Sequence, residues 1–333
     1  MMKNKMTDHE RGVFVFCLFL FCSCMIRGEK FVFTTAWTPQ AEFAGYYVAK
    51  EKGFYKEAGL DVDIRYPSLT SSVYHRLETD ECDAGMFSMM SAINMIAKGT
   101  PLVNILQTSM NSSCLIVSRW GKDPMEEKGK RLAVYVSDPN YLAFIVDRKR
   151  QTHYEWVLFS ENINVFLSGA VDMMSAVSYN EYILLKQAGF EMSEKNIFRF
   201  KDHGYNIQEN GVYVKRDYFD THREQVARFA EASKRGWEWT AAHPDQALDI
   251  VMKYVREGNV QTNRVIQKLM LAEILRLQKD SDSGKREFRV RPDMVKKASS
   301  LMKDFGMIDR EVTYQELMGQ TPKISDKKKS EVI

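Results

Sequence analysis

The feature of this sequence that most restricts its fold is an alternation of strand-like and helix-like segments, which occurs in two rounds. In the first round, β-rich runs such as residues 30–35 and 61–66 alternate with helical patterns such as residues 42–52. The second round begins at residue 131 and includes a helical pattern over residues 141–150. Because this order favours a parallel sheet covered by helices, we predict an α/β protein built from two such units.

At 333 residues the chain is too long for one small core and suits two lobes. Two extended segments, residues 113–118 and 212–215, connect the α/β units. We therefore predict two parallel-core lobes joined by two crossover segments. The predicted parts are a discontinuous first lobe over residues 25–109 and 218–320, a second lobe over residues 110–217, and a disordered basic tail over residues 321–333.

The N-terminus carries an export signal. A basic start, an apolar run over residues 13–21 and a small residue before Cys24 are typical of a secretory signal peptide over residues 1–24. Residues 21–24 also resemble a bacterial lipobox, in which Cys24 is lipidated and becomes the mature N-terminus. We predict an exported lipoprotein, anchored in a membrane at the periplasmic face or cell surface. A plain signal peptide and an uncleaved anchor are the alternatives.

Several other classes of protein find no support. The net charge is only +3, and no basic stripe with interleaved aromatic residues is present, so we predict no nucleic-acid partner. The six histidines are scattered without an HExxH motif, and the phosphate-binding and hydrolase motifs are missing, so we predict no metal and no cofactor. Cys82 and Cys114 show no metal or redox spacing, and whether they form a disulfide stays open. We expect a monomer.

Ligands of open α/β sheets bind beyond the carboxyl ends of strands and between domains. Trp37 follows the first strand, where it either stacks on a flat ligand or packs between the lobes. Tyr46 and Tyr47 point apart on one helix, so we expect one in the core and the other at the cleft, with Tyr46 as the candidate. Polar residues at the predicted strand ends are either ligand contacts or helix caps and turns: Ser88, Asn111, Ser112 and Ser137.

Three segments carry a family resemblance. Residues 37–62 closely resemble the opening of transporter receptors in the superfamily that binds thiamine pyrimidine precursors and alkanesulfonates. Residues 167–172 and 179–182 look like the second-lobe signature of the pyrimidine-precursor branch, and residues 236–247 resemble its helical return. The resemblance implies a two-lobed periplasmic binding protein fold of type II. It also implies a substrate-binding protein that serves an ABC transporter permease and captures a small heterocycle, a thiamine pyrimidine precursor.

The second-lobe motif adds Tyr179, Asn180 and Glu181 to the candidate site. A carboxylate at a helix start usually complements the helix dipole. An aminopyrimidine, however, presents a hydrogen-bond donor beside a ring nitrogen, and a carboxyl group is a natural partner for that edge. We therefore predict that Glu181 binds the edge of the ligand while Trp37 stacks on its face.

The same superfamily contains an enzyme, the thiamine pyrimidine synthase, which uses its own pyridoxal phosphate and histidine with iron. The resemblance places the required Lys and His at Phe87 and Ser91, and the cysteine cluster near residues 205–214, where this chain has none. Without the amine no Schiff base forms, so we predict a receptor rather than an enzyme. A receptor for an alkanesulfonate, a nitrate-like anion or another aromatic compound is the remaining alternative, but the predicted strand-end loops are poor in Arg and Lys.

Overall fold

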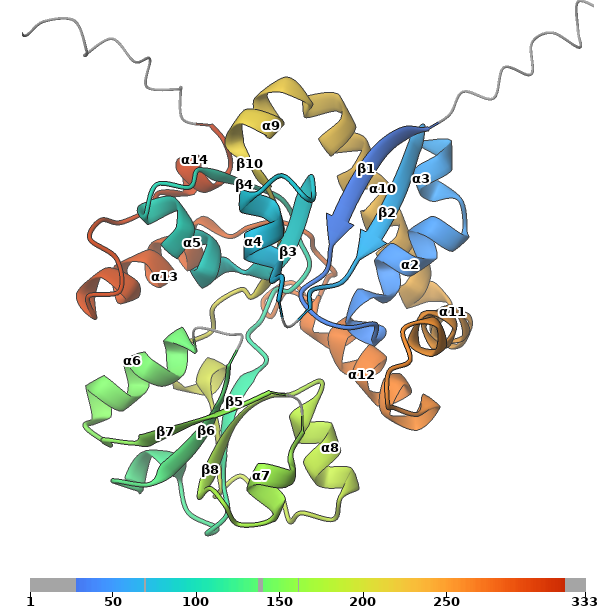
Figure 1. The fold of residues 1–333 in the computed structure, drawn as a ribbon. Helices are drawn as coiled ribbons and strands as arrows, with labels where there is room; N and C mark the ends of the chain where they lie inside the picture. The colour runs from blue at the N-terminus through green and yellow to red at the C-terminus, as the bar shows by residue number, and fades with distance from the viewer. Residues whose placement is uncertain (1–27, 69, 137–139, 161, 321–333) are drawn as a thin grey trace, which may run out of the picture.

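Two five-stranded sheets divide the chain into two lobes in the computed structural model (Figure 1). The structure describes residues 28–68, 70–136, 140–160 and 162–320. The predicted signal peptide with Cys24, the candidate Ser137 and the predicted basic tail lie outside these residues. The prediction of an α/β fold with two lobes is confirmed.

The first sheet has the strand order β2-β1-β3-β10-β4. β1, β2 and β3 run parallel, whereas β10 is antiparallel to both of its neighbours. The strands are β1 (Glu29–Thr34), β2 (Leu60–Arg65), β3 (Ala84–Ser88), β4 (Leu102–Gln107) and β10 (Asn210–Lys215). The helices of this lobe are η1 (Ala41–Phe43), α2 (Ala44–Glu51), α3 (Phe54–Glu57), α4 (Val73–Glu78), α5 (Met89–Ala97), α9 (Arg216–Thr221), α10 (Arg223–Ala242), α11 (Pro244–Glu257), α12 (Arg264–Leu277), α13 (Pro292–Asp304) and α14 (Tyr314–Leu317).

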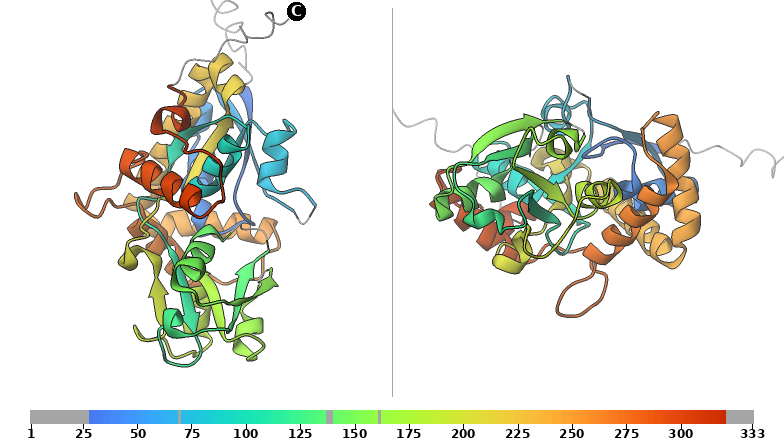
Figure 2. Two further views of the ribbon diagram at one scale, coloured as in Figure 1. Left: turned by 90° about the vertical axis from the view of Figure 1, so that its left-hand side faces the viewer. Right: turned by 90° about the horizontal axis from the view of Figure 1, so that it is seen from below.

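The second sheet has the strand order β7-β6-β8-β5-β9, with β6 parallel to β7 and β8, and with β5 antiparallel to β8 and β9. In Figure 1 and in the left view of Figure 2, this sheet and its helices form a separate body below the first lobe. The elements are β5 (Cys114–Ser118), β6 (Arg131–Tyr135), β7 (Glu155–Phe159), β8 (Met173–Val177), β9 (Ile197–Arg199), η2 (Pro124–Glu126), α6 (Tyr141–Arg150), α7 (Asn164–Leu167), α8 (Glu181–Gln187) and η3 (Phe200–His203).

Helix starts follow local sequence signals. The hydroxyl of Ser72 accepts a hydrogen bond from the His75 N–H, and that of Ser88 accepts one from the Ser91 N–H, which caps α4 and α5. α11 begins at Pro244, where the missing N–H costs no intrahelical bond.

α2 and α10 pack closely because glycines face each other between them. A Cβ on Gly236 would lie 2.0 Å from the Gly45 carbonyl oxygen, and a Cβ on Gly45 would lie 2.2 Å from the Trp237 ring. The fully buried Trp237 ring lies edge-on to Tyr46, with centroids 5.8 Å apart. The core of the first lobe therefore includes both faces of α2, which leaves little of that helix for the surface.

The chain crosses between the lobes at residues 108–113 and 204–209. The Glu209 carboxylate accepts hydrogen bonds from the hydroxyls of Ser112 and Ser113, each at 2.6 Å, and so ties the two crossing segments together. The predicted second lobe ran to residue 217, but β10 pairs with β3 and β4, so residues 210–215 belong to the first sheet. A strand in the middle of a sheet looks the same in sequence as an extended connection, because both are short apolar runs.

Cys82 and Cys114 are not joined by a disulfide in the structure. In the part of the chain that the structure describes, no helix is both long enough and apolar enough to span a bilayer. The same residues contain no group of three His, Cys, Asp or Glu side chains placed to hold a metal ion.

Candidate functional site

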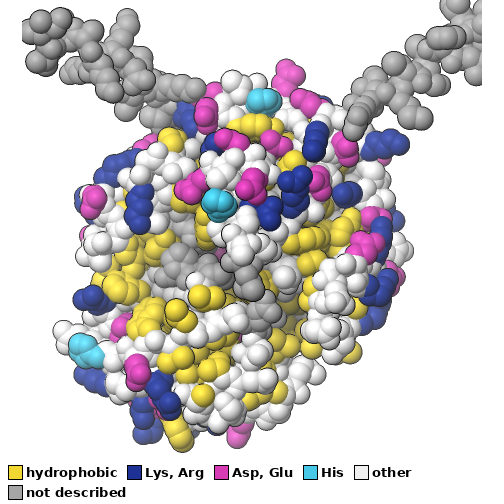
Figure 3. Space-filling model, viewed as in Figure 1, with side chains coloured by type: hydrophobic (Ala, Val, Ile, Leu, Met, Phe, Trp, Pro, Cys, Tyr) yellow, Lys and Arg dark blue, Asp and Glu magenta, His cyan; other side chains and the backbone are white. Residues whose placement is uncertain are grey.

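A cavity of about 670 Å³ lies between the two lobes, and we call it the first cavity. Its walls come from residues at or just after the carboxyl ends of β1, β3, β6, β7 and β8. They are completed by η1, by the start of α4 with the segment before it, and by Asn210 of β10. Figure 3 shows hydrophobic side chains gathered between the lobes on this face, with charged side chains mostly around its periphery. The position agrees with the expectation that ligands bind beyond the carboxyl ends of strands.

Aromatic rings line the first cavity from both lobes: Trp37, Tyr74, Phe87, Tyr135 and Tyr179. Trp37 from the first lobe and Tyr135 from the second lie edge-on, with ring centroids 6.1 Å apart. Tyr74 and Phe87 form a second pair at 5.1 Å. Flat apolar walls of this kind bind a planar ring by stacking and by edge-to-face contact.

Glu42 places a carboxyl group at the wall of the first cavity, although its side chain is only 4% exposed. One carboxylate oxygen accepts from the Gln40 amide at 2.6 Å. The other accepts from the Asn210 amide at 2.7 Å and from the Tyr179 hydroxyl at 3.2 Å. Burial raises the pKa of Glu42 from 4.5 to about 7, against the lowering effect of these hydrogen bonds. Near neutral pH this group is therefore able both to donate and to accept.

Sequence reasoning missed Glu42. An acidic residue in the first turn of a helix is ordinarily exposed and complements the helix dipole. Its partners Tyr179 and Asn210 are far away in the sequence, so only the closed fold shows that its carboxyl group is enclosed. Glu42 lies within the family-like segment over residues 37–62. The only local sign of its burial is the broad apolar face of the predicted helix over residues 42–52.

Glu181 lies one layer behind the wall of the first cavity. It is 2% exposed, and its carboxylate accepts from the Val177 N–H at 3.0 Å and from the Asn180 amide at 2.6 Å. Tyr135 also bonds this carboxylate, and burial raises the pKa of Glu181 above its usual value. Val177, Asn180 and Tyr135 all line the cavity, so Glu181 positions the second-lobe wall in this structure.

The structure separates the other predicted site residues into two groups. Trp37, Ser88, Tyr179 and Asn180 line the first cavity together. Tyr46, Asn111 and Ser112 do not. Tyr46 is fully buried in the first-lobe core, because both sides of α2 are covered by neighbouring elements. Asn111 accepts from the Asn206 amide at 3.0 Å and Ser112 donates to Glu209, so both hold the crossing segments together.

The polar groups of the first cavity are nearly all neutral. Apart from Glu42, its described lining residues offer amides, hydroxyls and one imidazole, and none of them is Lys or Arg. A binding site for an anion ordinarily gathers Arg, Lys or helix N-terminal amides. The capped starts of α4 and α5 lie at this cavity, but no described Lys or Arg lines it beside them. The aromatic rings and neutral polar groups suit a flat molecule that stacks and hydrogen-bonds through its edge.

The chain is similar to curated proteins of two kinds. The chain is 24% identical over 251 residues to the formylaminopyrimidine-binding protein of Halalkalibacterium halodurans. The aligned region covers 72% of this chain and 74% of that protein. It is also 24% identical over 240 residues to the 4-amino-5-hydroxymethyl-2-methylpyrimidine phosphate synthase of Candida albicans. That aligned region covers 66% of this chain and 69% of the synthase.

The fold also has solved counterparts. The periplasmic aliphatic sulphonate binding protein SsuA of Escherichia coli superposes with a TM-score of 0.62 at 14% identity, over 87% of this chain and 91% of that chain. This likeness confirms the predicted two-lobed periplasmic binding protein fold. Because the family model described as NMT1/THI5 like matches residues 40–247, more than half of the sequence, the chain belongs to the NMT1/THI5-like family.

Proposed function

We propose that this protein is the substrate-binding component of an ABC import system and captures an aminopyrimidine thiamine precursor between its lobes. The observation that carries the proposal is the chemistry of the first cavity. Its aromatic walls enclose a buried carboxyl group, and none of its described lining residues is Lys or Arg. The relative named as a formylaminopyrimidine-binding protein points to the same class of ligand.

The proposed ligand uses both parts of the site. Stacking on Trp37 contributes ~0.5–1.5 kcal/mol beyond area burial but does not distinguish one flat ring from another. Selectivity needs a polar group at the ring edge. Protonated Glu42 donates its O–H to a ring nitrogen while its other oxygen accepts from the neighbouring amino group. The Asn180 and Asn210 amides supply further neutral hydrogen-bonding groups at the wall.

Two alternatives fit the cavity less well. A pyrimidine synthase needs a lysine amine for pyridoxal phosphate, but Phe87 lines the cavity at the aligned position, and Ser91 is hydrogen-bonded to Ser88 at 2.9 Å and Tyr74 at 3.1 Å. A sulfonate ligand would have to be held by the starts of α4 and α5 without a cationic side chain, because the described wall provides no Lys or Arg. These observations favour a receptor for a neutral or weakly basic heterocycle.

The proposed setting follows from the N-terminal sequence. Export by the signal peptide and lipidation of Cys24 would hold the protein at the outer face of a membrane, beside the permease to which it delivers its ligand. We expect the receptor to act there as a monomer.

Calorimetric titration tests the function. Wild-type protein should bind 4-amino-5-hydroxymethyl-2-methylpyrimidine and should not bind taurine. Glu42→Ala should weaken pyrimidine binding about tenfold or more, because a buried donor on the ligand loses its partner. Glu181→Ala should also weaken it, through the second-lobe wall, and the exposed Glu231→Ala is the matched control.

Two results would contradict the proposal. Tight taurine binding without pyrimidine binding would make the protein a sulfonate receptor. Single-turnover formation of the phosphorylated pyrimidine from pyridoxal phosphate, histidine and iron in air would make it a synthase. Mass spectrometry of the small molecule that copurifies with the protein gives an independent identification.

A further inference from the structure

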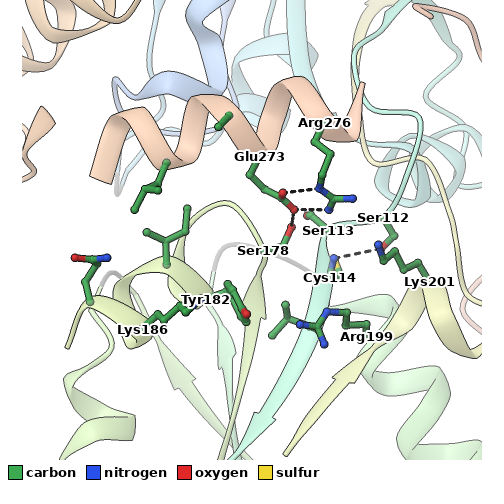
Figure 4. A pocket seen from close by; sticks show the side chains of 15 residues that line it. Ser112, Ser113, Cys114, Ser178, Tyr182, Lys186, Arg199, Lys201, Glu273 and Arg276 are labelled. Atoms are coloured by element: carbon green, nitrogen blue, oxygen red, sulfur yellow. Dashed lines mark hydrogen bonds and ion pairs between the residues drawn. The ribbon is translucent and has the colours of Figure 1, made fainter. Parts of the chain in front are cut away.

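A second cavity, also of about 670 Å³, lies on the other side of the end of β8. Val177 and Tyr179 line the first cavity, whereas Ser178 between them lines the second. Consecutive residues at this strand end therefore face different cavities. The second cavity is bounded by α8, β5 and the β9–η3 segment of the second lobe and by α12 of the first (Figure 4).

The one acidic residue among its described lining residues is already neutralised. Arg276 donates to both oxygens of Glu273, at 2.6 and 2.7 Å, and the Ser178 hydroxyl donates to one of them at 2.5 Å. Burial alone would raise the pKa of Glu273, but these hydrogen bonds and the nearby cations hold it below its usual value. Glu273 is thus a paired carboxylate that joins α12 to the end of β8, as Figure 4 shows.

Three further cations line the second cavity: Lys186, Arg199 and Lys201. Arg199 pairs with Glu194, which is 83% exposed, at 2.8 Å. Among the described residues, no carboxylate lies within ion-pair distance of Lys186 or Lys201. The Lys186 ammonium and the Arg199 guanidinium lie 6.0 and 5.6 Å from the centre of the Tyr182 ring, so both converge on one wall.

The two cavities have equal volume and opposite chemistry. The described lining of the first has no Lys or Arg, and that of the second has four such residues against one paired carboxylate. Like charges gathered in a concave site raise the local potential and attract counter-ions. Arg forks and Lys ammonium groups are the side chains with which proteins bind phosphate.

We propose that the second cavity binds a small phosphate-bearing anion. Lys186 and Lys201 form no ion pair with a described carboxylate, and Arg199 adds a guanidinium at the same cavity. Ser112, Ser113 and Ser178 are polar neighbours at the crossing segments. This site is separate from the proposed heterocycle site, so either one can be tested without the other.

The test is calorimetric titration with glycerol 3-phosphate and with inorganic phosphate at constant ionic strength. Wild-type protein should bind at least one of them saturably, with one site per chain. Lys186→Gln combined with Lys201→Gln should weaken that binding about tenfold or more. Lys296→Gln combined with Lys297→Gln, on exposed positions of α13, removes the same charge elsewhere and should leave the affinity within about twofold.

A flotation assay separates the two sources of phosphate. Vesicles of phosphatidylcholine with and without phosphatidylglycerol show whether a lipid headgroup is bound, and the same two double variants apply. Absence of saturable binding to every probe, or equal affinity of the two double variants, would overturn the proposal. Lys186→Gln alone, at an exposed position, repeats the test if the double variant unfolds, and unchanged pyrimidine binding shows that the first cavity is intact.

Discussion

Replacing Glu42 by glutamine should change how the stability of the protein depends on pH. Burial raises the pKa of this carboxyl group from 4.5 to about 7, so its contribution to the free energy of unfolding is fully present below pH 4.5 and is lost as the pH rises through 7. Above pH 7 the folded protein has to hold a desolvated carboxylate, which the nearby Glu181 carboxyl group disfavours further. Glutamine has nearly the same shape and does not ionise.

The size of the effect follows from the pKa. A change from 4.5 to about 7 corresponds to about 3 kcal/mol, at ~1.4 kcal/mol per pKa unit. The amide of Glu42→Gln keeps an oxygen for the Tyr179 and Asn210 donors, and turning the Gln40 amide lets its own oxygen accept from the new N–H. The free energy of unfolding of the variant, minus that of wild type, should therefore rise by about 3 kcal/mol between pH 4.5 and about pH 8.

Urea unfolding followed by circular dichroism at a series of pH values measures this difference without ligand. Glu231→Gln, at an exposed position of α10, is the control and should follow wild type at every pH. A difference between Glu42→Gln and wild type that stays constant from pH 4.5 to about pH 8 would refute the reasoning, because the carboxyl group would then ionise equally easily in both states.

Three further predictions use other parts of the chain. Trp37→Ala should weaken binding of every flat heterocycle with little change in selectivity. Trp120→Ala, at a residue that is 56% exposed, should leave binding unchanged. Equal calorimetric affinities of the two variants would show that Trp37 is not part of the site. Gly236→Ala should lower the free energy of unfolding by ~2 kcal/mol or more, because its Cβ would lie 2.0 Å from a backbone oxygen of α2. A urea midpoint no lower than that of Glu231→Ala, at an exposed position of α10, would contradict this close packing. Cys24→Ala should release the protein from the membrane fraction, and mass spectrometry that finds an unmodified mature N-terminus would exclude the lipid anchor.

Local sequence determined the elements and the general place of the site. The helical pattern over residues 42–52 corresponds to η1 and α2, and that over residues 141–150 corresponds to α6, because helix periodicity and end signals act over a few residues. The position of Trp37 in the first cavity was also predictable, because a residue that follows a parallel strand closely lies at the carboxyl edge of the sheet. The family-like segments also identified the two-lobed fold.

Only the tertiary structure decided which side chains meet. Glu42 becomes a buried carboxyl group because Tyr179 of the second lobe and Asn210 of β10 enclose it, and neither contact leaves a mark on its neighbours in the sequence. The sequence of β10 is equally consistent with an extended connection between the lobes, and only its pairing with β3 and β4 shows that it is a strand of the first sheet. The second cavity likewise exists because α12 packs across from α8, and the charges that line it come from segments far apart in the chain. Burial, and the pKa that follows from it, depends on how those distant segments close around each group.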